Sequence, residues 1–357
     1  MATSMKNTRK HKRKKRGKGK SIFLILLVAL ISSCIFYFGL LSSGTKFNED
    51  EVILFISENN TNKQLIKKEI HKNLHSIHYI TFLALCHSTG YFNNIKPGRY
   101  ILKKGTSVFS IFRKLHNGNQ DPIKITITKV RTRQDLANYL EKKFESTSSD
   151  FLNFMNNNDS LSNYGLTKET ILTLVIPNTY EFYWNTNPRS FFNKMKKEAT
   201  KFWNESRLEK LHRIGISKEQ AFTIASIVEE ETNDNTEKPT IASVYMNRIK
   251  KGMPLGADPT IKFAVNDFTI KRVTLKHINN TSNSPYNTYR NKGLPPGPIC
   301  TPSIASIDAV LKGEKTDYLY FCAKADFSGS HSFAATAKEH FANARKYRKA
   351  LDNKGIR

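Results

Sequence analysis

The chain has 357 residues, of which 39% are hydrophobic and 24% charged, a composition that excludes an intrinsically disordered protein and allows more than one domain. Lys and Arg number 57 against 30 Asp and Glu, which gives a net charge of +27. Such an excess predicts a polyanionic partner, which could be nucleic acid, anionic lipid or a polymer that carries carboxylates. Charge alone does not choose among these three.

The start of the chain combines a basic tail with an apolar segment. Residues 1–20 contain ten Lys or Arg and no acid, and residues 21–45 contain no charged residue. That length is sufficient for one membrane-spanning helix. Positive charge directly before it predicts a cytoplasmic tail, with everything beyond residue 45 outside the inner (cytoplasmic) membrane. We therefore expect a single-pass membrane protein and no nucleic-acid partner.

The cysteines suggest one alternative for the apolar segment. Ile31-Ser32-Ser33-Cys34 is similar to a lipoprotein processing box, but the apolar run continues beyond it, which favours an uncleaved helix. The other cysteines are Cys86, Cys300 and Cys322, and the spacings fit neither a zinc site nor a dense disulfide framework. The sequence therefore predicts no metal site and no cofactor.

Residues 46–128 are predicted to form a small α/β module. Short apolar runs predict strands at 51–56, 99–105 and 122–128. A helix is predicted between the last two strands, with Thr106 as its N-cap and Gly118 at its end. Helical spacing predicts that this helix buries one apolar face, formed by Val108, Ile111, Phe112 and Leu115.

Residues 129–357 are predicted to form a mostly helical catalytic domain. It divides into a connecting part at 129–213 and a motif-bearing core at 214–351. Leu136, Leu140 and Phe144 predict one apolar helical face in the connecting part. The aromatic-rich segment at 173–184 is interpreted as a packed hinge, with sugar stacking as the alternative.

Three consecutive glutamates, Glu229 to Glu231, end a helix whose predicted N-cap is Ser217. At about 100° per residue, Glu230 points away from the buried side and should be solvated. Glu229 and Glu231 lie on the two flanks, where partial burial raises the pKa of a carboxyl and keeps it protonated for acid catalysis. Periodicity does not separate these two, and a plain solvated helix end is the third interpretation.

Four segments, in this order along the chain, resemble the endolytic murein transglycosylase family, also called the YceG-like family. They read ASIVEEET, ASVYMNRIKKGMPLGADPTIKFAV, SPYNTYRNKGLPPGPICTP and DYLYFCAKADFSGSHSF. The resemblance runs from about Asp50 to Leu351 and implies an α+β protein with a lysozyme-like catalytic domain. It also implies that Glu229 is the catalytic acid.

A second, looser resemblance concerns the module at 46–128. The stretch KPGRYILKKGTSVFSIFRKLHNG is similar to the LysM-like domain at the N-terminal end of the same family. That resemblance implies contact with glycans that contain N-acetylglucosamine. A packing or spacer module without affinity for glycan is the equal alternative.

The family resemblance implies a lyase that cleaves the MurNAc-GlcNAc β-1,4 bond inside nascent peptidoglycan strands. The products would carry 1,6-anhydro-MurNAc ends, and the cut would terminate glycan elongation. One carboxyl suffices, as acid towards the glycosidic oxygen and then as base towards the C6 hydroxyl, whereas hydrolysing glycosidases generally use two. The implied partners are peptidoglycan strands and the inner membrane, with peptidoglycan synthases as candidates. A non-catalytic membrane-anchored peptidoglycan-binding scaffold and a lysozyme-type hydrolase are the alternative functions.

The motif SPYNTY contains most candidate substrate contacts. Tyr286 and Tyr289 offer ring faces to sugars, and Asn287 offers an amide to the N-acetyl group. Thr288 lies between them. Arg248 could pair with a carboxylate of the stem peptide. The alternative for these residues is a structural hydrogen-bond network.

Three further candidates are Asn247, Asp258 and His331. A helix N-cap before Pro259 is the favoured interpretation of Asp258, and a surface loop is the alternative for His331. Two positions depart from the family pattern: Gly256 stands where Gln is usual, and Asn178 stands where Asp is usual. A substrate contact made by that Gln would be missing in this chain.

Overall fold

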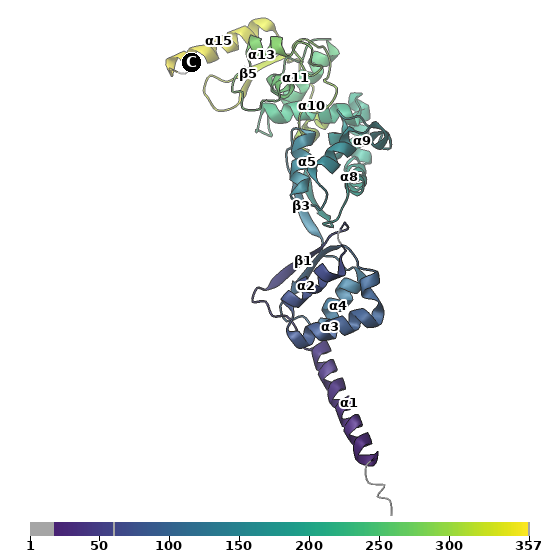
Figure 1. The fold of residues 1–357 in the computed structure, drawn as a ribbon. Helices are drawn as coiled ribbons and strands as arrows, with labels where there is room; N and C mark the ends of the chain where they lie inside the picture. The colour runs from purple at the N-terminus through teal and green to yellow at the C-terminus, as the bar shows by residue number, and fades with distance from the viewer. Residues whose placement is uncertain (1–17, 60, 356–357) are drawn as a thin grey trace, which may run out of the picture. The chain divides into compact units, whose positions relative to one another are not determined.

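The structure is a computed structural model that describes residues 18–59 and 61–355, so most of the predicted basic tail lies outside the described residues. The chain divides into two compact units between Asp121 and Pro122. Both units contain helices and strands (Figure 1), as expected for a mixed α and β protein.

The first unit begins with α1 (Lys18–Leu41), which is long and apolar enough to cross a membrane. Its large apolar side chains, from Ile22 to Leu41, are mostly exposed, so little of the protein covers them. The helix continues through Cys34 without a break, and the Cys34 side chain is exposed. The helix is therefore compatible with a membrane span and ends four residues earlier than predicted.

The remainder of the first unit is a two-stranded antiparallel sheet covered by helices. Strand β1 (Glu51–Ile56) pairs with β2 (Gly98–Lys103). The predicted face of the last helix is buried, but its N-cap is Ser107 and not Thr106, because Ser107 accepts the hydrogen bond from the Ser110 amide. The other elements are α2 (Lys63–Asn73), α3 (Ser76–Thr89), η1 (Tyr91–Asn93) and α4 (Val108–Asn117).

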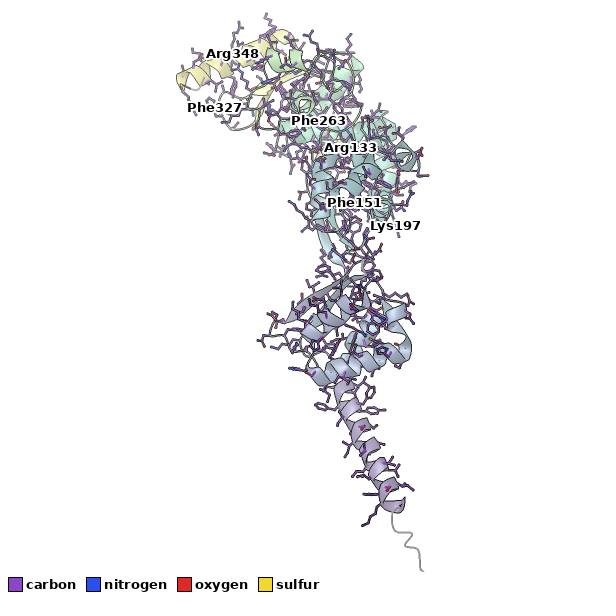
Figure 2. All side chains as sticks on the ribbon, viewed as in Figure 1. Arg133, Phe151, Lys197, Phe263, Phe327 and Arg348 are labelled. Atoms are coloured by element: carbon purple, nitrogen blue, oxygen red, sulfur yellow. The ribbon has the colours of Figure 1, made fainter. Side chains whose placement is uncertain are left out.

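The second unit opens with β3 (Ile123–Ile127), which pairs antiparallel with β4 (Asn178–Phe182). The predicted strand at 122–128 therefore belongs to this unit and not to the first module. Strand β4 lies within the aromatic segment, and its buried Tyr180 and Phe182 belong to the same hydrophobic core as Phe151, labelled in Figure 2. Helices of this part are α5 (Arg133–Glu141), α6 (Ser148–Asn156), α7 (Asn158–Ser162), η2 (Ile171–Leu174) and α8 (Pro188–Phe202).

Helix α10 (Lys218–Glu231) is the central helix of the motif-bearing part. Ser217 caps it in a capping box with Gln220, as the sequence predicted, and every residue from Ala221 to Val228 is buried. Three helices pack around it, namely α11 (Lys238–Lys250), α12 (Asp258–Val265) and α14 (Ile304–Lys312). The other elements are α9 (Glu205–Ile214), α13 (Leu275–Asn280), β5 (Tyr320–Ala323), β6 (His331–Ala334) and α15 (Ala337–Asn353).

The Gly-Pro-rich segment at 293–299 is held directly on α10. The Ser226 hydroxyl is fully buried and donates to the Thr223 carbonyl while it accepts from the Ile299 amide over 3.0 Å. Gly297 leaves no space for a side chain, because a Cβ there would lie 2.1 Å from the Glu169 carbonyl oxygen. This packing fixes the C-terminal half of α10, and with it the direction in which the glutamates project.

Candidate active site

The three glutamates at the end of α10 line one open hollow, together with Lys129 and residues 232–234 and 328–329. All three are partly buried, so none is a freely solvated charge. Their partners differ, however. These partners determine which carboxyl can carry a proton near neutral pH.

Glu229 is held as a carboxylate by the start of α14. Its Oε2 atom accepts hydrogen bonds from the Ser303 hydroxyl at 2.6 Å and the Ser306 hydroxyl at 2.5 Å, and it pairs with Lys238 Nζ at 3.2 Å. Burial alone would raise the pKa of Glu229, but these hydrogen bonds and the ammonium lower it below its usual value. The expectation that burial keeps Glu229 protonated is therefore wrong.

Glu230 is the centre of an ion pair and not a solvated side chain. Its carboxylate oxygens lie 3.1 Å from Lys129 Nζ and 3.1 Å from Arg131 Nη2, and only 16% of the side chain is exposed. The expectation of a solvated Glu230 is wrong, because the segment before α5 supplies two cations to that side of the helix.

Glu231 has the environment of a proton donor. Burial, and the negative charge of Asp258, raise the pKa of Glu231 to about 7, although Tyr245, Lys262 and Arg248 act in the opposite direction. The Tyr245 hydroxyl donates to Glu231 Oε1 over 2.6 Å. Burial and the adjacent carboxyl raise the pKa of Tyr245, so its hydroxyl stays a donor.

Asp258 and Tyr289 border Glu231 on the side of α12. Asp258 is the first residue of α12, where Ala257 and not Asp258 occupies the cap position. The carboxylate of Asp258 instead accepts from the Tyr289 hydroxyl over 2.5 Å, and both side chains are exposed. The N-cap interpretation of Asp258 is therefore wrong, and its charge is available to Glu231 and to a ligand.

Two other residues of the motif SPYNTY are structural. The Asn287 amide is fully buried and donates to the Ile278 carbonyl over 2.8 Å and to the Thr281 carbonyl over 3.2 Å. Thr288 is buried as well and hydrogen-bonds Thr260 over 2.8 Å. Neither side chain is free to contact substrate, which corrects the expectation for both. They shape the loop that presents Tyr289.

Tyr286 is partly buried and packs against the hydrophobic core. Its ring lies 4.6 Å from the ring of Phe263, labelled in Figure 2. Burial raises the pKa of Tyr286 to about 12. Tyr289, with 36% of its surface exposed, is therefore the better ring face for a sugar.

The two candidate residues on α11, Asn247 and Arg248, donate hydrogen bonds to backbone carbonyls. Asn247 donates to the Thr316 carbonyl over 2.7 Å, and Arg248 donates to the carbonyls of Leu319 and Leu255. These bonds hold the segments before α12 and β5 on α11, which favours the framework interpretation. Arg248 still contributes positive charge to Glu231.

His331 pairs with a carboxylate, and Gly256 lies in a turn whose backbone conformation favours glycine. His331 Nδ1 lies 2.9 Å from Glu237 Oε2, and its ring packs edge-on against Phe321. Gly256 has a φ of 57°, and a Cβ there would lie 3.3 Å from Arg248 Nη1. Gln would be strained in this left-handed conformation. The backbone of the turn before α12 therefore favours glycine at position 256.

Sequence reasoning missed Tyr245 and Lys238. Tyr245 lies in ASVYMNR on α11, where helical spacing marks it only as a core residue, and Lys238 begins the same helix. Both are buried polar groups, and a buried polar group needs a partner. That requirement is visible only once α11 is packed on α10.

Comparison with known proteins gives the family. The sequence model of the YceG-like family matches residues 55–346. The endolytic murein transglycosylase of Bacillus subtilis is 32% identical over 270 residues, which cover 71% of this chain and 74% of the relative. The protein of the same name from Streptococcus pneumoniae is 26% identical over 285 residues, and the match spans 71% of this chain and half of that relative.

A solved structure agrees with this assignment. A YceG-like protein from Listeria monocytogenes superimposes with a TM-score of 0.54 and 26% identity, over 82% of this chain and 98% of that chain. With a family match from residue 55 to residue 346 and a relative at 32% identity, this chain is a member of the YceG-like family.

Proposed function

We propose that the protein is an endolytic murein transglycosylase, a lyase that cuts peptidoglycan strands internally, and that Glu231 is its general acid and base. The sequence prediction of Glu229 for that role stays the alternative. The names of the relatives support the reaction class. The environment of the three glutamates supports the choice of residue.

One observation carries the assignment to Glu231. Burial and the negative charge of Asp258 raise the pKa of Glu231 to about 7. The Ser303 and Ser306 hydroxyls and the Lys238 ammonium instead bind Glu229 Oε2 and lower the pKa of Glu229. A general acid must hold a proton at the working pH, and a group with a pKa near that pH can also take a proton back. Glu231 satisfies both needs, whereas Glu229 is an ionised carboxylate tied to Lys238.

The proposed reaction uses the carboxyl twice. Tyr245 donates to Oε1 of Glu231, so Oε2 is the oxygen that presents the proton to the glycosidic oxygen. Once the glycosidic bond breaks, the Glu231 carboxylate takes the proton of the C6 hydroxyl of MurNAc. That oxygen then bonds to C1 and closes the 1,6-anhydro ring, and no water enters the product. Tyr289 is the proposed stacking surface for a sugar, and its exposure of 36% supports this role.

A lysozyme-type hydrolase is the second candidate, and the position of Asp258 is the observation that favours it. Two carboxylates flank the scissile bond in most hydrolysing glycosidases, and Asp258 acts electrostatically on Glu231. In the transglycosylase mechanism Asp258 has a different task, because its charge keeps Glu231 protonated. The glycan ends of the products distinguish the two reactions.

We expect purified protein to release fragments with 1,6-anhydro-MurNAc ends from uncrosslinked peptidoglycan strands. Mass spectrometry separates these fragments from reducing ends, which are heavier by one water. Fragments with reducing ends would identify the hydrolase. No release by the folded protein would support a non-catalytic scaffold instead.

The raised pKa of Glu231 predicts a pH profile. Activity should fall as the pH rises above about 7, because Glu231 loses the proton that it must donate. Asp258→Asn removes a negative neighbour, which lowers the pKa of Glu231 and moves this alkaline limb to lower pH. Initial rates of fragment release between pH 5 and pH 9 measure the limb. Asp308→Asn is the control: it changes an exposed ion pair with Arg207 and should leave the alkaline limb at its native pH.

The protein is proposed to act from the outer face of the inner membrane. The apolar helix α1 follows a basic tail, and that order predicts a cytoplasmic N-terminus. The catalytic residues would then face nascent strands, close to peptidoglycan synthases. A reporter that is active only outside the membrane, fused after Leu351, tests this orientation.

A further inference from the structure

The end of α1 is built into the first unit and is not attached through a free linker. Gly39 approaches α3 so closely that a Cβ there would lie 2.4 Å from Thr81 Oγ1. Ser42 Oγ hydrogen-bonds His78 Nε2 over 2.8 Å. Backbone hydrogen bonds continue this contact through residues 44–46. The direction of α1 therefore fixes which face of the first unit points towards a membrane that α1 spans.

That face contains a helix without formal charge. Residues 73–95, which include all of α3, contain no Asp, Glu, Lys or Arg, although 24% of the chain is charged. The outer side of α3 is nevertheless exposed, with Ile77 at 38% and Ile80 at 66%. Surface helices of globular proteins normally place charged or polar residues there. A contiguous apolar surface marks an interaction site, whereas apolar residues exposed singly do not, so the neighbours of α3 decide.

Helix α4 packs against α3 and contributes a third exposed apolar residue. Both α3 and α4 contact α1, and both lie at the α1 end of the first unit in Figure 1. Phe109 of α4 is 40% exposed, and the guanidinium of Arg113 lies 5.8 Å from its ring centre. Aromatic and basic side chains together are typical of the boundary between lipid head groups and acyl chains.

We propose that Ile77, Ile80 and Phe109 form a lipid-facing surface that lies in the head-group boundary of the bilayer spanned by α1. The proposal rests on the proposed membrane anchoring of α1. The exposed apolar side chains of α1 continue to Leu41, and its last turn meets α3 at Ile77, the first of these three residues, because a Cβ at Gly39 would lie 3.8 Å from the Ile77 carbonyl oxygen. Lipid contact on α3 and α4 fixes the tilt and rotation of the first unit on the membrane.

Quenching by brominated lipid tests the surface in the full-length protein. Three single variants are compared in vesicles of phosphatidylcholine and phosphatidylglycerol, with and without bromine on the acyl chains. Ile80→Trp reports the surface and Phe36→Trp reports α1. Ile53→Trp is the matched control, because Ile53 is also exposed, at 40%, but lies on β1. Trp184 and Trp203 give the same background in every variant and are subtracted.

We expect the added emission of Ile80→Trp and Phe36→Trp to be blue-shifted and quenched by bromine, and that of Ile53→Trp to be neither. Quenching of Phe36→Trp alone would refute the lipid-facing surface while leaving the anchor in place. No quenching of either would refute the anchor as well. A blue shift of Ile80→Trp without quenching would mean that protein covers α3, which also refutes the proposal.

Discussion

Glu231→Gln is expected to lower fragment release by about 10²–10⁴-fold while the protein stays folded. The substitution keeps the shape of the side chain, and the Gln Oε1 atom can still accept the hydrogen bond of Tyr245. It removes the one proton that has to reach the glycosidic oxygen. Because the proposed mechanism uses the same carboxyl as acid and as base, no partner compensates for its loss. Release of fragments from uncrosslinked strands, at equal concentrations of folded enzyme, measures the effect.

Glu230→Gln is the control for this measurement. Its carboxylate is ion-paired with Lys129 and Arg131 and has no part in the proposed proton transfer. Fragment release by this variant should therefore stay within a few-fold of the native rate. Circular dichroism confirms folding in both variants. Near-native release by Glu231→Gln would remove Glu231 from the mechanism.

The local features of α10 could be predicted from the sequence. Ser217 and Gln220 form a capping box, and this box depends only on residues three apart. Helical periodicity placed Glu229 and Glu231 on the flanks of the buried face, and both are partly buried. These features follow from the geometry of a single helix.

The identity of the acid could not be predicted in this way, because the partners of each carboxyl come from distant segments. Glu229 receives Ser303 and Ser306 from α14, and Glu230 receives Arg131 from the segment before α5. Periodicity gives the direction of a side chain and not the group that it meets. The pKa of a carboxyl depends on those groups, so two flanks that look equivalent in the sequence differ in the fold.

Asp258 shows the same limit at a helix start. The sequence Asp-Pro-Thr is typical of an N-cap followed by Pro, yet Ala257 holds the cap position and Asp258 is the first helical residue. The partner of its carboxylate is Tyr289, which is 31 residues away in the chain. A local pattern therefore predicted the start of α12 correctly to within one residue, while a tertiary contact decided the role of the side chain.

Glu229→Gln is expected to destabilise the second unit by about 3–5 kcal/mol, because it leaves a buried cation without its partner. Only 6% of the Lys238 side chain and 14% of the Glu229 side chain are exposed, and their atoms lie 3.2 Å apart. The midpoint of urea unfolding measures the change. Both tryptophans, Trp184 and Trp203, lie in the second unit, so their fluorescence reports its unfolding.

The pH dependence of this loss has a definite sign. The pKa of Glu229 is lowered in the folded protein, so its stabilising contribution is complete above the usual pKa of 4.5 and is lost as the pH falls below it. The difference between the native protein and Glu229→Gln should therefore be largest near neutral pH and shrink on acidification.

A double variant separates the structural role of Glu229 from a catalytic one. Glu229→Gln together with Lys238→Met removes the unpaired cation, so the double variant should recover part of the lost stability. Because Glu231 is intact in both variants, the folded fraction of each should still release anhydro-ended fragments. If Glu229→Gln unfolds at the native midpoint yet releases no fragments, the acid is Glu229 and the assignment to Glu231 is wrong.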